Sequence, residues 1–481
     1  MNSPRITLLD SQAAELSAFL DAHPSKHERG AIVLFRRLGM EIPGLERSDR
    51  YLAVEIIPFN EAWVTTSSPS HVAFELKNFR ELFRKCEEES LVFGFVHNHP
   101  GGPAEFSSID DDNEQTLLAA VRNRNGSDVH LVALLWAQGV WKARVRHGSN
   151  PGVAKPARHV AVVGRSLVMH VDSAKGGHDE VFARQAAAFG QPFATQLQSL
   201  RVAVVGAGGT GSPVITLLAR SGVGEIVVID GDTLERSNLN RVRGAGGADV
   251  GEKKAQILKR YVDSLQLPVC TAAIDTHVDQ NAAAIDALAS CDVIFGCTDD
   301  QIGREILTTS LYFHAQAYVD MGLGGQVSED TNGRPYLRYH YGRISTILPE
   351  SGECLFCQGV IKDTWIRHQY AVRQNPDLTV EEARERYLQN GGEQAPGVGP
   401  FTSAVADYAV ATLFDLLQPF RKFPPELRRD FLKIDFVRME FSSSQEKSDP
   451  DCVYCRQHEF LLNGDQYRLG RPALGRRNVY V

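Results

Sequence analysis

The chain has 481 residues, of which 43% are hydrophobic and 23% are charged, and its formal net charge is −8 with a pI near 6.0. This length predicts two to four domains, the composition is that of a globular protein, and the acidic balance argues against nucleic acid as a partner. No apolar run approaches the roughly 20 residues that cross a bilayer, so we expect no membrane partner. Residues 1–19 predict an amphipathic helix instead of a signal peptide, which favours a cytoplasmic protein.

The N-terminal third predicts a small α+β domain over residues 1–148. Helical spacing of apolar residues covers residues 9–22, and a second helical pattern follows Ser107. The strands expected around these helices are the short apolar runs 31–35, 51–57, 91–96, 129–136 and 140–145. The last two are joined by Ala137-Gln138-Gly139, which is a hairpin signal. Residues 149–180 begin with Gly, Pro and basic residues and predict a linker.

From about Arg201 the apolar strands alternate with helices, which predicts a Rossmann-like, parallel-rich α/β sheet over residues 181–481. The sequence GAGGTGS follows a buried-strand run, and Ser212-Pro213 then begins a helix. Such a loop lets the backbone approach a phosphate, and the helix N-terminus attracts the negative charge. The glycines expected to contact a nucleotide are Gly206, Gly208, Gly209 and Gly211.

Charged residues beyond the glycine loop bear on which nucleotide binds. Asp230 ends the next strand, where a carboxylate can accept hydrogen bonds from a ribose hydroxyl. The sequence DGDTLERSNLNR then supplies cationic arginine side chains. The sequence CTDD places Asp299 at the end of a later strand, where a carboxylate can hold Mg²⁺. Cations aimed at a phosphate chain serve triphosphate cleavage better than hydride transfer. We therefore expect ATP and Mg²⁺, with an NAD-dependent oxidoreductase as the alternative.

These motifs, in this order, resemble the ThiF/MoeB and ubiquitin-activating enzyme superfamily over about residues 180–460. The resemblance implies that the C-terminal carboxylate of a ubiquitin-like protein, usually ending Gly-Gly, attacks the α-phosphate of ATP and gives an acyl-adenylate. It also implies a homodimer through the adenylation domain, in which Arg184 reaches the γ-phosphate of the partner subunit, and a conjugating enzyme as a further partner. The nucleotide-site residues that it implies are Asp230, Asp232, Asn238, Arg241, Lys254 and Asp299.

Two CxxC pairs predict a zinc cage, because four thiolates on two tight turns complete a tetrahedral ligand set. The four cysteines are Cys354, Cys357, Cys452 and Cys455. With every position filled, this zinc is expected to be structural, and a redox dithiol is the alternative. No cysteine lies between the two pairs, where many ubiquitin-activating relatives form a thioester. The chain is therefore expected to stop at the adenylate or to pass it to a nucleophile on another protein. Thr402 and Ser403 are possible acceptors, but helix capping is the favoured role for both.

A second metal pattern lies in the N-terminal domain, where His97-Asn-His99-Pro ends a strand and Ser107-x-x-Asp110 opens a helix. Two histidines one residue apart on an extended segment point to the same side, so both can bind one metal with Asp110. Three protein ligands leave a position for water, as catalytic zinc requires. Taken alone, Ser107 and Asp110 are better explained as a capping box.

The full string resembles the JAB/JAMM (MPN) metallopeptidase motif, over about residues 5–146. The resemblance implies Zn²⁺ on the two histidines and Asp110, with Ser107 stabilising the oxyanion. It also implies an upstream glutamate that takes a proton from zinc-bound water. Glu28 fits that place, and Glu55 in the second strand is the alternative.

The two resemblances point to one substrate class. A metallopeptidase that trims or detaches a ubiquitin-like protein would be fused to an enzyme that activates the same C-terminus. This layout resembles bacterial ubiquitin-like operon proteins, for which a defence role is one pathway beside sulfur transfer and conjugation. A non-catalytic module that binds a ubiquitin-like protein is the remaining alternative.

Overall fold

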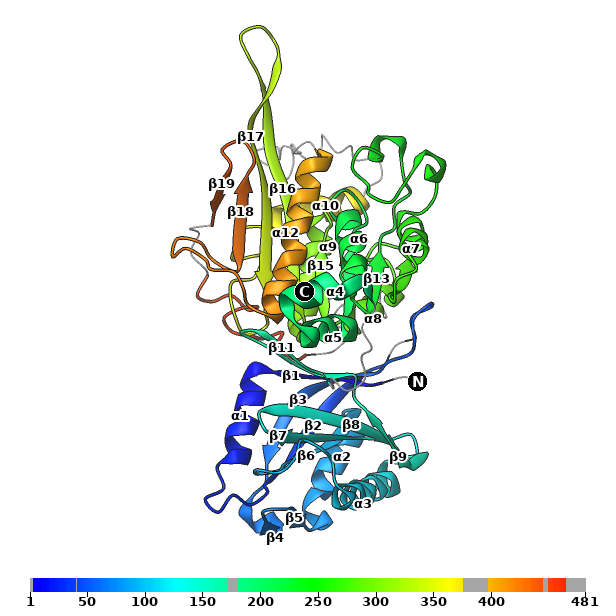
Figure 1. Ribbon diagram of the computed structural model, residues 1–481, viewed down its shortest axis with the longest axis vertical. Helices are drawn as coiled ribbons and strands as arrows, with labels where there is room; N and C mark the ends of the chain where they lie inside the picture. Colours follow the sequence, from blue (N-terminus) through cyan, green and yellow to red (C-terminus); the bar gives the residue numbers. More distant parts are fainter. Residues whose placement is uncertain (1–2, 40, 172–179, 375–396, 444–448, 464–481) are drawn as a thin grey trace. The chain divides into compact units, whose positions relative to one another are not determined.

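The computed structural model describes residues 3–39, 41–171, 180–374, 397–443 and 449–463, which fall into two compact units (Figure 1). The N-terminal unit comprises residues 1–41 and 46–177, and the C-terminal unit comprises residues 42–45 and 178–481. Within the described ranges, no helix combines the length and the apolar composition needed to cross a bilayer.

The N-terminal unit is built on one sheet, whose described strands lie in the order β11-β10-β1-β3-β2-β6-β7-β8-β9. These strands are β1 (Arg5–Leu9), β2 (Gly30–Leu38), β3 (Arg50–Pro58), β6 (Leu91–Asn98), β7 (His130–Ala137), β8 (Val140–His147), β9 (Asn150–Pro156), β10 (His159–Val163) and β11 (Leu167–Val171). A separate hairpin pairs β4 (Val64–Ser68) with β5 (His71–Phe74). The helical elements are α1 (Asp10–Asp21), η1 (Glu61–Trp63), η2 (Leu76–Phe79), α2 (Arg80–Glu88) and α3 (Ser108–Asn125).

Both faces of this sheet are buried. Along β2, Val33 and Phe35 belong to the apolar cluster that includes residues of α1, whereas Ile32 and Leu34 belong to the cluster that includes residues of α2 and α3. This alternation follows from the two-residue period of a strand, which sends successive side chains to opposite faces. The sheet is therefore an internal layer with helices on each side.

The structure differs from the predicted linker over residues 149–180. Strands β9, β10 and β11 occupy most of that segment and belong to the N-terminal sheet. The glycine and prolines that suggested a linker lie in β9, which pairs with β8 and forms an edge of the sheet, where proline is tolerated. The segment 1–19 also differs from the predicted helix, because β1 precedes α1 and pairs in parallel with β3 and β10.

The C-terminal unit has the expected parallel-rich, Rossmann-like sheet, in the order β14-β13-β12-β15-β16-β17-β18-β19 among the described strands. Its strands are β12 (Arg201–Val205), β13 (Glu225–Ile229), β14 (Cys270–Ile274), β15 (Val293–Gly296), β16 (Ala317–Glu329), β17 (Pro335–Ile347), β18 (Phe431–Asp435) and β19 (Glu440–Ser442). The first five pair in parallel, and β17 to β19 extend the sheet in antiparallel fashion. Because the strand order reverses between β12 and β15, their carboxyl ends flank a topological switch point, where α/β sheets bind ligands.

The described helices of this unit precede the sheet, join its parallel strands or follow β17. They are α4 (Ala183–Phe189), α5 (Gln191–Ser199), α6 (Gly211–Arg220), α7 (Lys254–Ser264), α8 (Ala282–Ala289), α9 (Gln301–His314), α10 (Asp363–Gln374) and α12 (Gly399–Leu417), with short turns η4 (Glu180–Phe182), η5 (Arg236–Asn238) and η6 (Gly247–Asp249). Helix α6 packs beside α7 and α12, whereas α9 packs beside α8 and α10. Helix α12 begins earlier than the predicted Ser403, and Ala395-Pro396 of the motif before it lie outside the described residues.

Candidate functional site

The predicted metal ligands of the N-terminal unit converge at the carboxyl end of β6. Phe93 and Phe95 of β6 belong to the apolar cluster that includes residues of α3, and the two-residue period places His97 on the same face. The rings of Phe95 and His97 stack with their centroids 5.3 Å apart. Asp110 lies in the first turn of α3, so the strand end and the helix start supply ligands from two sides.

The distances within this group fit a tetrahedral zinc ion. His97 Nε2 lies 3.2 Å from His99 Nε2 and 3.0 Å from Asp110 Oδ1, and His99 Nε2 lies 3.5 Å from Asp110 Oδ2. Ligand atoms about 2.0–2.1 Å from a tetrahedral zinc are separated by about 3.3 Å. The other ring nitrogen of His99 lies 3.1 Å from the carbonyl oxygen of Pro103, which orients the ring as a metal-binding histidine needs.

The first turn of α3 positions Asp110 for metal binding. Its Oδ2 accepts hydrogen bonds from the backbone N–H of Ser107 at 2.6 Å and from the Ser107 hydroxyl at 2.8 Å, so the capping-box interpretation is confirmed. Burial raises the pKa of Asp110, but hydrogen bonds from His97 and His99 outweigh burial and hold that pKa well below its usual range. The carboxylate is therefore ionised and directed at the two histidines.

Glu28, and not Glu55, lies beside the metal-binding group. Its Oε1 is 3.9 Å from His99 Nε2, and the residue is 4% exposed. Burial raises the pKa of Glu28 to about 7, while the charge of His99 opposes that rise. Ser67 and Ser68 of β4 hold the backbone of Glu28 by hydrogen bonds of 2.9 and 2.8 Å. Glu55 instead forms an ion pair with Lys85 at 2.5 Å.

Sequence reasoning missed the residues that brace this site. Asn98 points to the opposite face of β6, where its Nδ2 donates to the Leu20 carbonyl at 2.8 Å and its Oδ1 accepts from the Arg29 N–H at 2.8 Å. It thereby ties the segment that follows Glu28 to the strand that carries the histidines. In the sequence, the position of Asn98 between the two histidines of a strand indicates that its side chain lies on the opposite face, and this was the signal that could have found it.

In the C-terminal unit, the glycine loop joins β12 to α6 at the switch point. Gly206 has φ +96°, which only glycine adopts readily. A Cβ on Gly211 would lie 1.8 Å from the carbonyl oxygen of Gly206, so these two positions exclude other residues. A Cβ on Gly208 would meet nothing within 4 Å, so the loop is open there. The predicted contacts thus divide into glycines that shape the turn and one that leaves space for a ligand.

Asp230 follows β13 and is tied to the glycine loop. Its Oδ2 accepts from the Ala207 N–H at 2.5 Å and its Oδ1 from the Asp232 N–H at 2.7 Å. Burial raises the pKa of Asp230, and these backbone N–H groups only partly oppose it. Asp232 itself is paired with Lys254 at 2.8 Å. The carboxylate expected at the ribose therefore also fixes the shape of the loop.

The remaining predicted phosphate contacts lie around the same loop. The guanidinium of Arg241 donates to the Ser237 carbonyl at 2.9 Å, and its Cδ would lie 3.0 Å from a Cβ on Gly209. Arg241 therefore extends beside the glycine loop. Asn238 is buried, its Oδ1 accepts from the Glu235 N–H at 3.2 Å, and its carbonyl accepts from the Arg241 N–H at 3.0 Å, so it holds the end of η5 that precedes Arg241.

The two aspartates of CTDD have different roles. Asp300 is the N-cap of α9, where its Oδ1 accepts from the Gly303 N–H. Asp299 is exposed at the end of β15, the strand that pairs with β12, and is the carboxylate that the fold leaves available at the switch point. Arg184 is exposed on α4, and its role toward a partner subunit stays a prediction.

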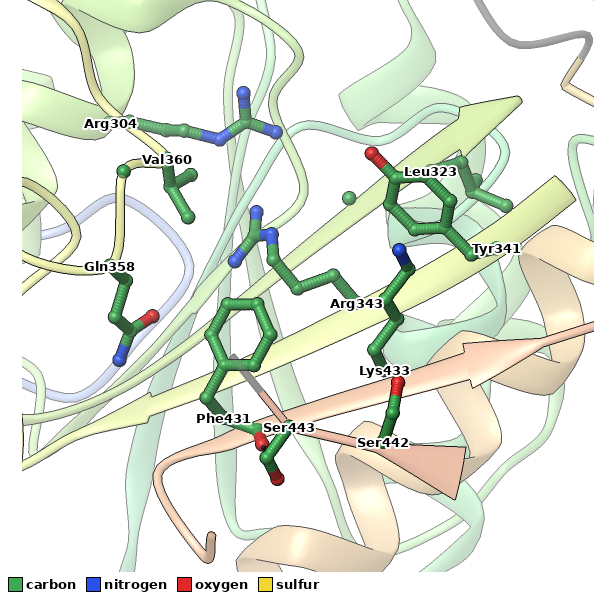
Figure 2. A pocket seen from close by; sticks show the side chains of 12 residues that line it. Arg304, Leu323, Tyr341, Arg343, Gln358, Val360, Phe431, Lys433, Ser442 and Ser443 are labelled. Carbon is green, nitrogen blue, oxygen red and sulfur yellow. Dashed lines mark hydrogen bonds between the residues drawn. The ribbon is translucent and has the colours of Figure 1, made fainter. Parts of the chain in front are cut away.

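A cationic cavity of about 480 Å³, which no sequence motif indicates, lies along β16, β17 and β18 (Figure 2). Its lining includes Arg304, Arg343 and Lys433, and Figure 2 shows the two arginines extending into the same space. The fully buried carboxylate of Asp320 contacts both arginines. It accepts a hydrogen bond from Arg343 and lies 3.4 Å from Arg304 Nε. Tyr318 donates to the other oxygen of that carboxylate at 2.7 Å.

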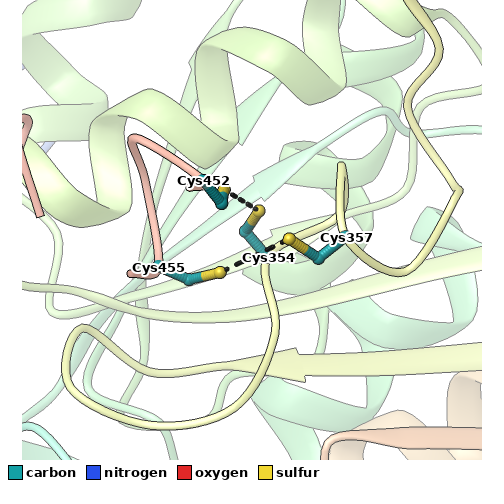
Figure 3. A group of neighbouring side chains, drawn as sticks. All are labelled: Cys354, Cys357, Cys452 and Cys455. Atoms are coloured by element: carbon teal, nitrogen blue, oxygen red, sulfur yellow. Dashed lines mark hydrogen bonds between the residues drawn. The ribbon is translucent and has the colours of Figure 1, made fainter. Parts of the chain in front are cut away.

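The four predicted cysteines meet in one buried cluster (Figure 3). Sγ of Cys354 lies 3.6 Å from Sγ of Cys452, and Sγ of Cys357 lies 3.6 Å from Sγ of Cys455. Disulfide sulfurs are about 2.05 Å apart, whereas thiolates about 2.3 Å from a tetrahedral zinc are separated by about 3.8 Å. The donor set therefore fits zinc and does not fit two disulfides.

Comparison with known proteins gives consistent results for the C-terminal unit. The ThiF family model matches residues 182–454. The SAMP-activating enzyme E1 of Haloferax volcanii is 40% identical over 163 residues, which are 34% of this chain and 54% of that protein. The ubiquitin-like modifier-activating enzyme 5 of Oryza sativa subsp. japonica is 24% identical over 279 residues, which are 55% of this chain and 59% of that protein. The chain thus spans little more than half the length of these curated relatives. A crystal structure of E. coli MccB covers 59% of this chain and 74% of its own at 18% identity, with a TM-score of 0.42.

Proposed function

Because the chain belongs to the ThiF family, we propose that its C-terminal unit uses ATP and Mg²⁺ to adenylate the C-terminal carboxylate of a ubiquitin-like protein. The observation that carries the proposal is the convergence of the glycine loop, Arg241 and Asp299 at the ends of two adjacent strands. The names of the relatives support the class of substrate, since both are activating enzymes of small protein modifiers.

The residues present can carry out each part of this reaction. The N–H groups around Gly208 and the start of α6 bind phosphate oxygens, and Asp299 holds Mg²⁺ against them. An oxygen of the partner's carboxylate attacks the α-phosphorus, the bond to the bridging oxygen breaks, and pyrophosphate leaves. Arg241 and Lys254 stabilise the charge of the leaving pyrophosphate once they exchange their present protein partners for it.

The cationic cavity gives the partner's C-terminal tail a place to lie. Arg304, Arg343 and Lys433 attract a carboxylate-bearing peptide, and Asp320 keeps the two arginines in position. Gly322 of β16 also lines this cavity, and a Cβ there would lie 2.9 Å from Nη2 of Arg343, so the glycine leaves room for that guanidinium.

The zinc cage has a structural role in this proposal. It joins the segment after β17 to the segment after β19, which are far apart in the sequence. Since no cysteine lies between the two CxxC pairs, we propose that the adenylate is the final product on this chain or is passed to another protein, such as a conjugating enzyme.

Isotope exchange between pyrophosphate and ATP tests the adenylation. We expect exchange only in the presence of a ubiquitin-like protein ending Gly-Gly, and a loss of about 10²–10³-fold for Arg241→Ala, the range for removing a group that stabilises developing charge. Arg236→Ala, which changes an exposed arginine of the neighbouring turn η5, is the matched control and should retain activity. Hydride transfer with NAD, or nucleotide binding without ATP preference, would instead favour an oxidoreductase.

We further propose that the N-terminal unit is a zinc metallopeptidase that hydrolyses peptide or isopeptide bonds at the C-terminus of the same partner. The geometry of His97, His99, Asp110 and Glu28 supports this second function. Zinc, when bound by the first three residues, supplies a water of lowered pKa. Glu28 is placed to accept a proton from a water at this site and would later give it to the leaving amine. Ser107 would donate to the developing oxyanion once its hydroxyl turns away from Asp110.

Cleavage of a partner protein fused through its C-terminus tests this activity. Glu28→Gln should lower kcat by about 10²–10⁴-fold, the usual contribution of a general base, and leave the zinc content unchanged. Glu55→Gln is the matched control, because Glu55 pairs with Lys85 and should not affect cleavage. Equal losses in the two variants, or none in either, would remove Glu28 from the mechanism and favour a binding module without activity.

We propose a homodimer in which Arg184 of one subunit acts at the nucleotide of the other. Its exposed position on α4 suits a residue that serves a second chain. Mixing Arg184→Ala subunits with Arg241→Ala subunits should restore part of the exchange activity, because one site of the mixed dimer regains both arginines. If the mixture stays as inactive as its components, Arg184 does not act between subunits.

A further inference from the structure

A second group of metal-ligand side chains lies in the N-terminal unit, outside the proposed peptidase site. His130 begins β7 and His147 ends β8, and the two residues stand opposite each other in the antiparallel register. Asp128 lies just before β7, and one ligand atom from each of the three residues lies within 4.8 Å of the others. His147 Nε2 is 3.1 Å from Asp128 Oδ1.

This group and the peptidase site are at opposite ends of the sheet. His97 of β6 pairs with Leu135 of β7, five positions from His130 along the strand. At about 3.3 Å per residue, the two groups are roughly 17 Å apart along the strand direction. A single ion therefore cannot serve both.

His130 has the bonding pattern of a histidine prepared for a ligand. One ring nitrogen, Nδ1, lies 2.7 Å from the hydroxyl of Tyr51, and the other, Nε2, is buried with no hydrogen-bond partner in the described part of the chain. A buried nitrogen left without a partner costs free energy that a ligand would recover.

We propose that Asp128, His130 and His147 bind a late first-row divalent cation such as Zn²⁺, through Nε2 of both histidines and the aspartate carboxylate. Imidazole and carboxylate are a ligand pair that this class of ion accepts. Tyr51 orients one ring. Ser149 orients the other through its Oγ, 2.5 Å from His147 Nδ1, and through its backbone N–H, which donates to the same nitrogen at 3.2 Å.

The surroundings of this site are compatible with a cation. Arg37 lies near His130, but Arg37 is paired with Asp49 at 2.8 Å, so its charge is largely balanced. Asp128 is 90% exposed, so an ion can enter from solvent and three protein ligands leave room for water. Binding would fix the end of the β7–β8 hairpin, because its first and last residues would share one ion.

Zinc content measured by elemental mass spectrometry tests the proposal. The full chain is equilibrated with buffered micromolar zinc and separated from free metal. We expect Asp128→Ala and His147→Ala to carry one zinc fewer per chain than the unmodified protein, and His71→Ala, a histidine of β5 outside this group, to carry the same number. The same difference of one is expected in a His99→Ala background, which removes the proposed peptidase zinc.

Each outcome decides the question. Because Asp128 is mostly exposed, Asp128→Ala should keep the fold, and circular dichroism establishes that both variants are folded. Equal zinc in the unmodified chain and in Asp128→Ala would overturn the proposal, whatever the peptidase and adenylation assays show. A loss of one zinc in both folded variants, with none in the control, would support it.

Discussion

Asp110 and Asp230 are buried aspartates at the two proposed catalytic sites, and their pKa values move in opposite directions. Burial raises both pKa values. At Asp110, hydrogen bonds from His97 and His99 outweigh burial and lower the pKa, whereas at Asp230 burial prevails over the backbone N–H groups that it accepts from. The first carboxylate is arranged for a cation, and the second is arranged to hold a loop.

The difference shows how far each site is assembled without its ligand. In the N-terminal unit the donor atoms already stand at the spacing of a zinc coordination sphere. In the C-terminal unit the long cations Lys254 and Arg241 are engaged by Asp232 and the Ser237 carbonyl, so binding phosphate requires them to change partners. We expect substitutions at the first site to abolish zinc binding and cleavage. We expect substitutions at the second site to reduce ATP–pyrophosphate exchange by degrees.

The largest effect is expected from His99→Ala. Loss of one of three zinc ligands should remove zinc from the peptidase site and bring cleavage down to the uncatalysed background, while ATP–pyrophosphate exchange stays unchanged. Zinc analysis and both assays on the same preparation measure this. Cleavage that survives without that zinc would show that the assembled geometry is not the catalytic one.

The next largest effect is expected from Asp299→Ala. Exchange should fall by about 10²–10³-fold, because the variant loses the carboxylate that holds Mg²⁺ against the phosphates. Asp300→Ala is the matched control from the same motif. It removes the N-cap of α9, so it should cost about 0.5–2 kcal/mol of stability and leave most of the exchange activity. If Asp300→Ala loses the exchange activity and Asp299→Ala retains it, then Asp300 and not Asp299 holds Mg²⁺.

Asp230→Asn should have a smaller effect. An amide oxygen can still accept one backbone N–H, so the loop should persist, but the charged hydrogen bond to the ribose is lost. Hydrogen bonds to charged groups contribute about 1.5–3 kcal/mol, which corresponds to about 10–100-fold weaker nucleotide binding. Calorimetric titration with ATP measures it. An unchanged affinity would mean that Asp230 serves the loop alone.

The fold of the C-terminal unit followed from its sequence because its signals are local. A buried-strand run, a glycine loop and a helix start lie together at Val202–Pro213, and the structure has β12 and α6 there. The two CxxC pairs were equally informative, because two thiolates on one turn have few other uses. The cavity with Arg304, Asp320 and Arg343 escaped prediction, because strand pairing and packing bring together residues whose local sequence carries no motif.

In the N-terminal unit the limits of local reasoning are clearest at Glu28 and β9. Two glutamates in extended segments were candidates for the base, and only the pairing of Gly30 with His97 places Glu28 beside the histidines. The prolines of β9 suggested a linker because the sequence does not show which strands lie at a sheet edge. Distances between strands come from tertiary pairing, so the site could be predicted as a set of residue types but not as a geometry.

The smallest expected effect concerns acid stability. Burial lowers the pKa of His170 below its usual 6.5, and its Nδ1 accepts from the Trp141 N–H at 3.4 Å. The unfolded chain then binds the proton of this residue more readily below pH 6.5, so His170 contributes stability that is lost as the pH falls. Glu28 and Asp230, whose pKa values burial raises, contribute with the opposite sign. His170→Asn, which retains an acceptor, should therefore lose less stability than the unmodified chain between pH 7.5 and roughly pH 5.5, whereas His71→Asn should lose as much. If both variants follow the unmodified chain, the acid sensitivity has another source.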